Sequence, residues 1–478
     1  MTDLPVLVWF RQDLRLSDNP ALDAAVKTGA SVIPVFVRDD DSAGEWRPGG
    51  ASRWWLHQSL TALTADLRKR DSRLVLRSGT ADRVILDLVQ QTGATAVYWN
   101  RLHESWAVHR DAALKVALED LGVAVHGLPG NLAFEPWTIR TGGGGPYRVF
   151  SPFMKACLRH GPPDAPLPAP KGWASPDDWP ASACLDAWAL QPTQPDWAGG
   201  LRDHWCPGET GARDRFSAFL DNGLDDYTQE RDQMARESTS RLSPHLHFGE
   251  ISIRSIWHAL DHREAEGARS VTRFRTELIW REFAHHLLFH YPTLPEANWR
   301  ETFDAFPWVE DDVALKAWQG GNTGYPLVDA GMRELWVSGY MHNRVRMVAA
   351  SFLIKHLAIH WRQGEDWFWD TLVDADLANN AAGWQWVAGS GADAAPFFRI
   401  FNPVLQGQRF DSDGAYVRRW LPVLKDLPDK YLHAPWTAPD DVLRNAGVSL
   451  GGNYPRPIVD HAAARARALE GYERVKQL

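Results

Sequence analysis

The chain has 478 residues, a globular composition and a formal net charge of −9. Its length allows two or three domains with separate cores, and its acidic balance argues against a protein that coats nucleic acid non-specifically. Three cysteines allow no disulfide framework, which favours a reducing cytosol and a cytoplasmic location. Tryptophan occurs 25 times, so we expect most copies to be structural and a minority to serve a cofactor or a base-stacking site.

The first 130 residues alternate strand and helix signals. Five apolar runs predict buried parallel strands: Val6–Phe10, Ser31–Val37, Leu74–Leu76, Ala96–Trp99 and Val123–Val125. The polar run Ser17-Asp18-Asn19 followed by Pro20 predicts a helix start, with a polar cap and Pro in the first turn. These signals predict a doubly wound α/β domain. No GxGxxG follows the first run, so an ordinary dinucleotide site is not expected, and the run is too short for a membrane span.

The middle of the chain has a different character. Residues 160–200 are rich in Pro, Ala, Trp and Asp and show no periodicity, which is typical of a connector. From residue 201 onward the pattern is helical. We therefore expect an α/β domain over residues 1–130, an inter-domain connector over 131–200 and an all-helical domain over 201–478.

A run of hydroxyl side chains, Thr239–Ser243, precedes a predicted helix. Its hydroxyl and backbone N–H groups, with the charge of Arg241, suit the binding of an anion such as a phosphate. Taken alone, the run is better explained as a group of helix N-cap residues. Both interpretations stay open at this point.

Two helical stripes suit the recognition of a flat polar base. In the first, Glu277, Trp280 and Arg281 are spaced i, i+3 and i+4, so an indole can stack while a carboxyl group forms hydrogen bonds. In the second, Asn343 and Met347 share a face of a locally basic helix. The alternatives are a surface ion pair beside a core Trp, and a packed helix with Met as filler. The second alternative does not explain the amide.

A run of acids and amides follows at Asp374–Asn380. It fails as a calcium loop, because Asn379 stands at the sixth position in place of Gly and Gln385 at the twelfth in place of Glu. Hydrogen bonding to a heterocycle explains the run better. Neither His285-His286 nor the pair at 245 and 247 has partner cysteines or an HExxH pattern, so no metal site is expected.

Together these motifs resemble the cryptochrome/photolyase family over nearly the whole chain, and most closely a bacterial cyclobutane pyrimidine dimer (CPD) photolyase. The segments that carry the resemblance are Trp9–Leu22, Thr239–Ser252, Glu277–Phe283, Thr323–Leu335, Met341–Met347 and Asp374–Pro403. The resemblance implies an α/β antenna domain, a long connector and an all-helical domain that binds FAD.

The resemblance also assigns roles to single residues. It implies FAD contacts for Tyr227, Thr239, Ser240, Arg241, Leu242, Ser243, Arg346, Asp374, Ala375, Asp376 and Asn380. It implies contacts with the lesion and the neighbouring DNA for Arg231, Glu277, Trp280, Arg281, Asn343, Arg344, Met347, Trp386 and Gln406. It implies an electron relay through Trp308, Trp361 and Trp384. Glu277, Met347, Asn380 and the relay would serve the reaction itself.

The implied enzyme is a deoxyribodipyrimidine photo-lyase, a carbon–carbon lyase that repairs UV-damaged DNA. It would act as a monomer and would not associate with a membrane. Splitting a cyclobutane ring requires one electron, delivered and later recovered, which excited reduced flavin can supply and no side chain can. The dimer must first be flipped out of the duplex. Trp280 and Trp386 would then stack on the flipped bases.

Two rivals remain within the family. Six-four photolyases carry two histidines where this chain has Asn343 and Met347, and their chemistry needs such a proton donor. Plant cryptochromes, which are blue-light receptors, usually carry Asp where Asn380 stands. The chain also stops soon after the helical domain, without a signalling tail. These differences favour dimer repair.

The antenna chromophore stays open between a folate, a deazaflavin and none. The folate pattern departs at Pro295-Glu296 and at Trp106-Ala107. The deazaflavin pattern departs at Leu102, although Arg53 matches an arginine of that pocket.

Overall fold

The structure is a computed structural model that describes residues 4–394 and 398–477. The chain forms two compact units. The first unit comprises Met1–Asp225, Ser240–Pro292 and Val373–Ala378, and the second comprises Asp226–Thr239, Thr293–Leu372 and Asn379–Leu478. The boundaries at residues 130 and 200 that we expect from the sequence stay a prediction.

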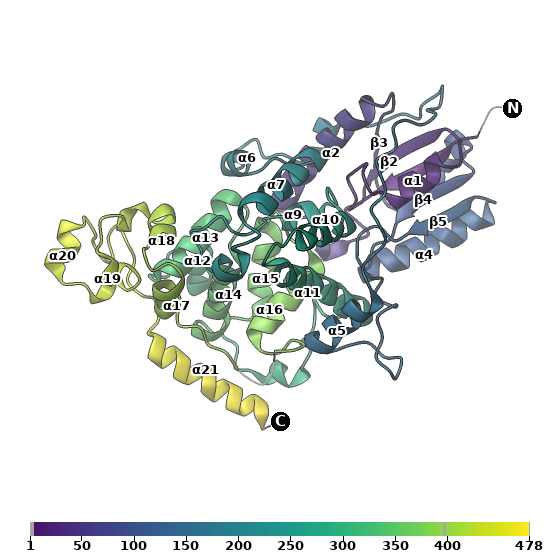
Figure 1. The fold of residues 1–478 in the computed structure, drawn as a ribbon. Coiled ribbons are helices and arrows are strands. Elements are labelled where there is room, and N and C mark those ends of the chain that lie inside the picture. The colour runs from purple at the N-terminus through teal and green to yellow at the C-terminus, as the bar shows by residue number, and fades with distance from the viewer. Residues whose placement is uncertain (1–3, 395–397, 478) are drawn as a thin grey trace. The chain divides into compact units, whose positions relative to one another are not determined.

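The first unit contains a five-stranded parallel sheet with the order β3-β2-β1-β4-β5 (Figure 1). The strands are β1 (Val6–Phe10), β2 (Val32–Arg38), β3 (Val75–Ser78), β4 (Ala96–Asn100) and β5 (Ala124–Leu128). All five predicted strands are present, and the α/β fold class is confirmed. The strand order reverses direction between β1 and β4, which is where open α/β sheets usually bind ligands.

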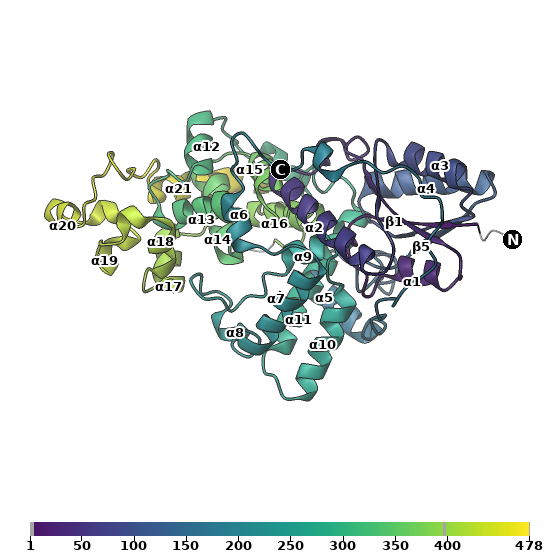
Figure 2. The same cartoon turned by 90° about the horizontal axis from the view of Figure 1, so that it is seen from above.

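Helices cover both faces of this sheet. The helices of the first unit, not all of which pack on the sheet, are α1 (Pro20–Val26), α2 (Gly50–Arg68), α3 (Ala81–Thr92), α4 (Ser105–Asp120), α5 (Phe150–His160), α6 (Gly199–His204), α7 (Glu209–Asn222), α9 (Ser243–His247), α10 (Ile253–Ala265) and α11 (Val271–His290). Side chains alternate along a strand, so Val8 packs in a core cluster with α1 and α2, while Leu7 packs with α3 and α4. Figure 2 shows this unit from above.

The start of α1 follows the sequence signal. Pro20 occupies the first turn, and the side chain of Asn19 accepts a hydrogen bond from the backbone N–H of Leu22. The cap satisfies a donor that has no partner within the helix. The predicted helix start is confirmed.

A short segment far along the chain completes the core of the first unit. Val373 is fully buried and belongs to the same core cluster as Val6 and Trp54. The next residues, Asp374 and Asp376, are also buried in this unit. The sheet unit is therefore assembled from parts of the sequence more than 300 residues apart.

The second unit is helical, as predicted. Its helices are α8 (Tyr227–Glu230), α12 (Asp312–Gln319), α13 (Pro326–Ser338), α14 (Asn343–Ser351), α15 (Trp361–Thr371), α17 (Pro403–Phe410), α18 (Ala415–Trp420), α19 (Asp429–Leu432), α20 (Asp440–Asn445) and α21 (His461–Lys476), and α16 (Leu377–Ala388) has its first two residues in the first unit. Among the described residues, none of the helices has the length and apolar character needed to cross a membrane.

Lys355 is a buried lysine in the π-helical turn Phe352–His356. Its side chain is almost completely enclosed, its ammonium group donates to the carbonyl of Arg399, and its nitrogen lies 4.2 Å from the ring centre of Phe398. Burial, together with the charge of Arg399, lowers the pKa of Lys355 to about 7. An unfolded lysine has a pKa of about 10.4, so folding releases a proton from this residue at intermediate pH.

We expect Lys355 to make the free energy of unfolding rise with pH between about 7 and 10. The unfolded chain holds the proton that the folded chain has lost, so stability increases by about 1.4 kcal/mol per pH unit in this range. Urea titrations at several pH values will measure this slope, and Lys355→Met should flatten it. Lys425→Met, at an exposed position, is the control. Equal slopes in the wild type and Lys355→Met would contradict the prediction.

Candidate functional site

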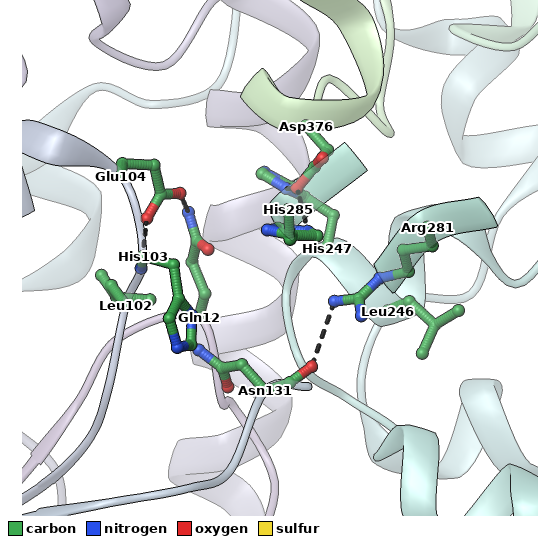
Figure 3. A pocket seen from close by; sticks show the side chains of 10 residues that line it. All are labelled: Gln12, Leu102, His103, Glu104, Asn131, Leu246, His247, Arg281, His285 and Asp376. Atoms are coloured by element: carbon green, nitrogen blue, oxygen red, sulfur yellow. Dashed lines mark hydrogen bonds and ion pairs between the residues drawn. The ribbon is translucent and has the colours of Figure 1, made fainter. Parts of the chain in front are cut away.

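A small polar pocket lies in the first unit at the carboxyl ends of β1 and β4. It is lined by Gln12, Leu102, His103, Glu104, Asn131, Leu246, His247, Arg281, His285 and Asp376 (Figure 3). The loops after the two strands supply the first four residues, and α9, α11 and the segment before α16 supply most of the others. The pocket thus occupies the point where the strand order reverses, lined by carboxylates, imidazoles and a guanidinium.

Two histidines surround the carboxylate of Asp376. His285 Nε2 lies 3.4 Å and His247 Nδ1 lies 3.7 Å from Asp376 Oδ2, with all three side chains about nine-tenths buried. Figure 3 shows both imidazoles beside the carboxylate. Burial alone raises the pKa of Asp376, but the charge of His285 and the contacts with His247 hold it well below its usual value. Asp376 is therefore an acceptor suited to N–H and O–H groups.

The hydroxyl run Ser240–Ser243 contacts the same acidic segment. The hydroxyl of Ser243 donates to Asp374, and the backbone N–H of Leu242 lies 3.4 Å from Ser240 Oγ. Arg241 has a left-handed backbone with φ +49°. In the part of the chain that the structure describes, no side chain caps α9, whose N-cap residue is Leu242. The N-cap explanation of this run is therefore wrong.

The α11 stripe carries a stacked indole and an ion-paired carboxylate. Phe150 of α5 lies parallel to Trp280, with ring centres 3.5 Å apart and planes at 5°, and Trp280 remains half-buried. Glu277 Oε1 lies 3.2 Å from Arg273 Nη2, one turn earlier on the helix. Phe150 fixes the indole plane, and Arg273 holds the carboxylate near it.

Arg281, on the same helix, faces the pocket. It is 3.0 Å from Glu282 Oε1 and donates to the carbonyl of Asn131 at 3.2 Å, the second contact being drawn in Figure 3. These contacts anchor the loop after the sheet to α11. The predicted DNA contact of Arg281 stays a prediction.

The helix α14 brings Asn343 and Met347 together in the second unit. Asn343 Nδ2 lies 4.0 Å from Met347 Sδ, and Asn343 is exposed. His342 caps the helix by accepting the N–H of Arg344. Arg346 donates to the carbonyl of Met341 at 2.6 Å. An exposed amide beside a half-buried thioether is the pair that the sequence predicts.

The remaining predicted residues of this unit lie on several elements. Trp386 on α16 lies under the guanidinium of Arg399, which is 5.2 Å from its ring centre. Asn380 on α16 donates to the carbonyl of Glu365 at 3.1 Å. Gln406 is half-buried on α17. Two predicted FAD contacts, Tyr227 and Thr239, belong to this unit, whereas Ala375 belongs to the first.

His360 contacts both Trp308 and Trp361. The ring of His360 lies 4.7 Å from that of Trp308 and 5.5 Å from that of Trp361. Trp308 is half-buried, whereas Trp361 is fully buried and donates to Asn298 at 2.9 Å. His360 also caps α15, and burial, with the charge of Arg362, lowers its pKa, which favours a neutral imidazole.

Trp384 packs against the helix that begins at Trp361. A Cβ atom at Gly364, three residues after Trp361, would lie 2.1 Å from Trp384 Cη2, so the indole occupies the space that the glycine leaves open. The same ring contacts Phe368 at 4.9 Å and Trp318 at 6.2 Å between ring centres. Trp361 and Gly364 are three residues apart and so share one face of α15. Trp384 therefore packs against the face of α15 that carries Trp361.

Comparison with known proteins identifies the family to which the chain belongs. Residues 6–171 match the family model of DNA photolyase, and residues 274–474 match the FAD binding domain of DNA photolyase. A deoxyribodipyrimidine photo-lyase from Agrobacterium fabrum is 55% identical over 99% of this chain and 98% of its own length. The chain belongs to the cryptochrome/photolyase family. The predicted family, photolyase enzyme class and FAD cofactor are thereby confirmed.

Other family members are also similar. A crystal structure of a class III photolyase from Agrobacterium tumefaciens has a TM-score of 0.97 and 54% identity, covering 100% of this chain and 99% of that one. Cryptochrome-1 from Arabidopsis thaliana is 40% identical over 99% of this chain and 70% of its own length. Proteins named photolyase and proteins named cryptochrome are thus both among the relatives.

The residues in the first unit fit part of an FAD molecule. Phosphates bind to hydroxyl and backbone N–H donors, which Ser240–Ser243 supply. Ribose hydroxyls and the flavin N–H need acceptors, which the ionised Asp376 and the neighbouring Asp374 supply. The chemistry of the donor set therefore agrees with the FAD-binding domain, and the individual contacts stay predictions.

Sequence analysis missed the histidines around Asp376 and the one beside Trp308. We considered His285 only as a metal ligand. Its place among apolar residues of α11 was the available signal, since a buried polar group needs a partner. His360 directly precedes Trp361, but nothing local points to Trp308.

Proposed function

We propose that the protein repairs cyclobutane pyrimidine dimers in UV-damaged DNA with light. When bound, reduced FAD supplies the photoexcited electron that splits the dimer and then takes it back. The contact of Asn343 with Met347 on α14 carries this proposal. An amide beside a thioether can hold a pyrimidine by hydrogen bonding and by soft packing. It offers no proton donor of the kind that six-four repair needs.

Side chains on α11 and, separately, on α14 have distinct proposed roles in recognition. Phe150 covers one face of Trp280, so a flipped base would stack on the other face, which contributes about 1–3 kcal/mol. Glu277, held by Arg273, would accept hydrogen bonds from a base. Arg344 would bind a backbone phosphate. Flipping itself costs a few kcal/mol, less for a damaged pair.

Illumination of the purified protein with its flavin reduced should restore thymine-dimer DNA. The loss of dimers from an oligonucleotide is measured by chromatography. Darkness and a six-four substrate are the controls, and both should show no repair. An absorption spectrum of the same sample will show the flavin and any folate or deazaflavin antenna pigment. The flavin must stay reduced throughout the assay, which its absorption spectrum will show. If the reduced, illuminated protein repairs no dimers, the result would contradict this proposal and favour a receptor function.

A further inference from the structure

Asp232 lies between Arg344, which the proposed function places on a DNA phosphate, and Arg231, for which the family resemblance implies a DNA contact. Its Oδ2 is 2.8 Å from Arg344 Nη2, and its Oδ1 is 4.0 Å from Arg231 Nε. All three residues belong to the second unit. The side chain of Asp232 is 36% exposed, against 18% for Arg344 and 13% for Arg231. The carboxylate is thus the most open member of the group.

Each guanidinium is also held by an aromatic ring. Arg344 lies 4.6 Å from the ring centre of Phe410, and Arg231 lies 5.3 Å from that of Tyr227. The backbone N–H of Met234 donates to the carbonyl of Phe410, which ties the segment after Asp232 to α17. The rings and this tie keep both guanidiniums beside the carboxylate when no DNA is bound.

A carboxylate and a phosphate compete for the same face of an arginine. Both accept hydrogen bonds from the planar guanidinium in the same way. A phosphate that approaches Arg344 must therefore displace Asp232 or bind beside a negative charge. Because the pair is partly exposed, its contribution is modest, which suits a contact that forms and breaks during each binding event.

We propose that Asp232 is an internal competitor for backbone phosphates at Arg344 and Arg231, and that it speeds the release of repaired DNA. The inference rests on the proposed function. A flipped dimer adds stacking contacts that outweigh the competitor. Once the dimer is split and the bases return to the duplex, mainly phosphate contacts remain, and Asp232 can take Arg344 back.

Asp232→Asn should bind an undamaged duplex about three- to fivefold more tightly at low salt, the range of an exposed ion pair. The site would gain one unit of net positive charge, so the slope of log K against log salt should steepen by about 0.9. Fluorescence anisotropy at several salt concentrations measures both quantities. Stopped-flow should show slower DNA dissociation, and Asp232→Glu should restore the wild-type values.

Glu310→Gln is the matched control, because it removes one exposed negative charge elsewhere in the same unit. It should change neither affinity nor slope as much. Melting temperature and flavin content will exclude misfolding. Arg344→Ala should weaken binding and remove most of the effect of Asp232→Asn, as a double-mutant cycle requires.

The outcomes separate the two proposals. If Arg344→Ala leaves DNA binding unchanged, the proposed DNA site is wrong and the competitor role falls with it. If Arg344→Ala weakens binding while Asp232→Asn fails to tighten it or slows no dissociation, the DNA site stands and the competitor role is overturned.

Discussion

Trp384→Phe will block light-driven reduction of the oxidised flavin while leaving repair intact once the flavin has been reduced chemically. Phe is much harder to oxidise than Trp, so it cannot pass on an electron. Trp384 is nearly fully buried against α15, the helix that begins with Trp361. We expect the photoreduction rate to fall at least about tenfold, equivalent to about 1.4 kcal/mol of barrier.

Absorption spectroscopy under blue light with an external thiol reductant will measure this rate. Trp436→Phe, at a half-buried tryptophan that packs edge to face against Tyr325 instead, controls for the loss of an indole. Flavin content and melting temperature will show whether the variant is folded. A folded Trp384→Phe protein with normal photoreduction would exclude Trp384 from the relay.

Gly364→Ala should both destabilise the second unit and disturb the relay. The added methyl would lie 2.1 Å from Trp384 Cη2 and 2.6 Å from Leu353 Cδ2, so the indole must move. Overpacking of this kind costs about 1–3 kcal/mol, and a displaced Trp384 should slow photoreduction. Urea unfolding and photoreduction are the two measurements.

Gly383→Ala, on α16, is the control for Gly364→Ala. Among the described residues, a methyl there would meet no side chain or backbone within 4 Å beyond its own helical neighbours, and Ala is a better helix former than Gly by about 1 kcal/mol. This variant should be as stable as the wild type or more stable, with normal photoreduction. Similar losses in both variants would show that the close contact at Gly364 has no special role.

The fold was predictable because its signals are local. A buried parallel strand must be apolar throughout, and the run Val6–Phe10 shows this within five residues. A helix start needs a cap close by, and the run Ser17–Pro20 offers one, which the structure places at Asn19. The boundaries of the two compact units were not predictable, because Val373–Ala378 joins the first unit through contacts that no local pattern encodes.

The site was predictable in its residue types but not in its partners. The spacing on α14 correctly places Asn343 beside Met347. The ion pair of Arg344 with Asp232 spans more than 100 residues, and so does the approach of His247 to Asp376. Such pairs depend on tertiary packing, and motif similarity names family residues without naming their neighbours.

The late position of Val373 also bears on how the protein is made. Its side chain fills the core beside the sheet, so a growing chain cannot close that core when residue 225 leaves the ribosome. At a synthesis rate of about 5–20 residues per second, the delay is about 7–30 seconds. During this time apolar surface stays open to other nascent chains. We therefore expect chaperones that hold a chain until its last segment arrives to assist the folding of the first unit.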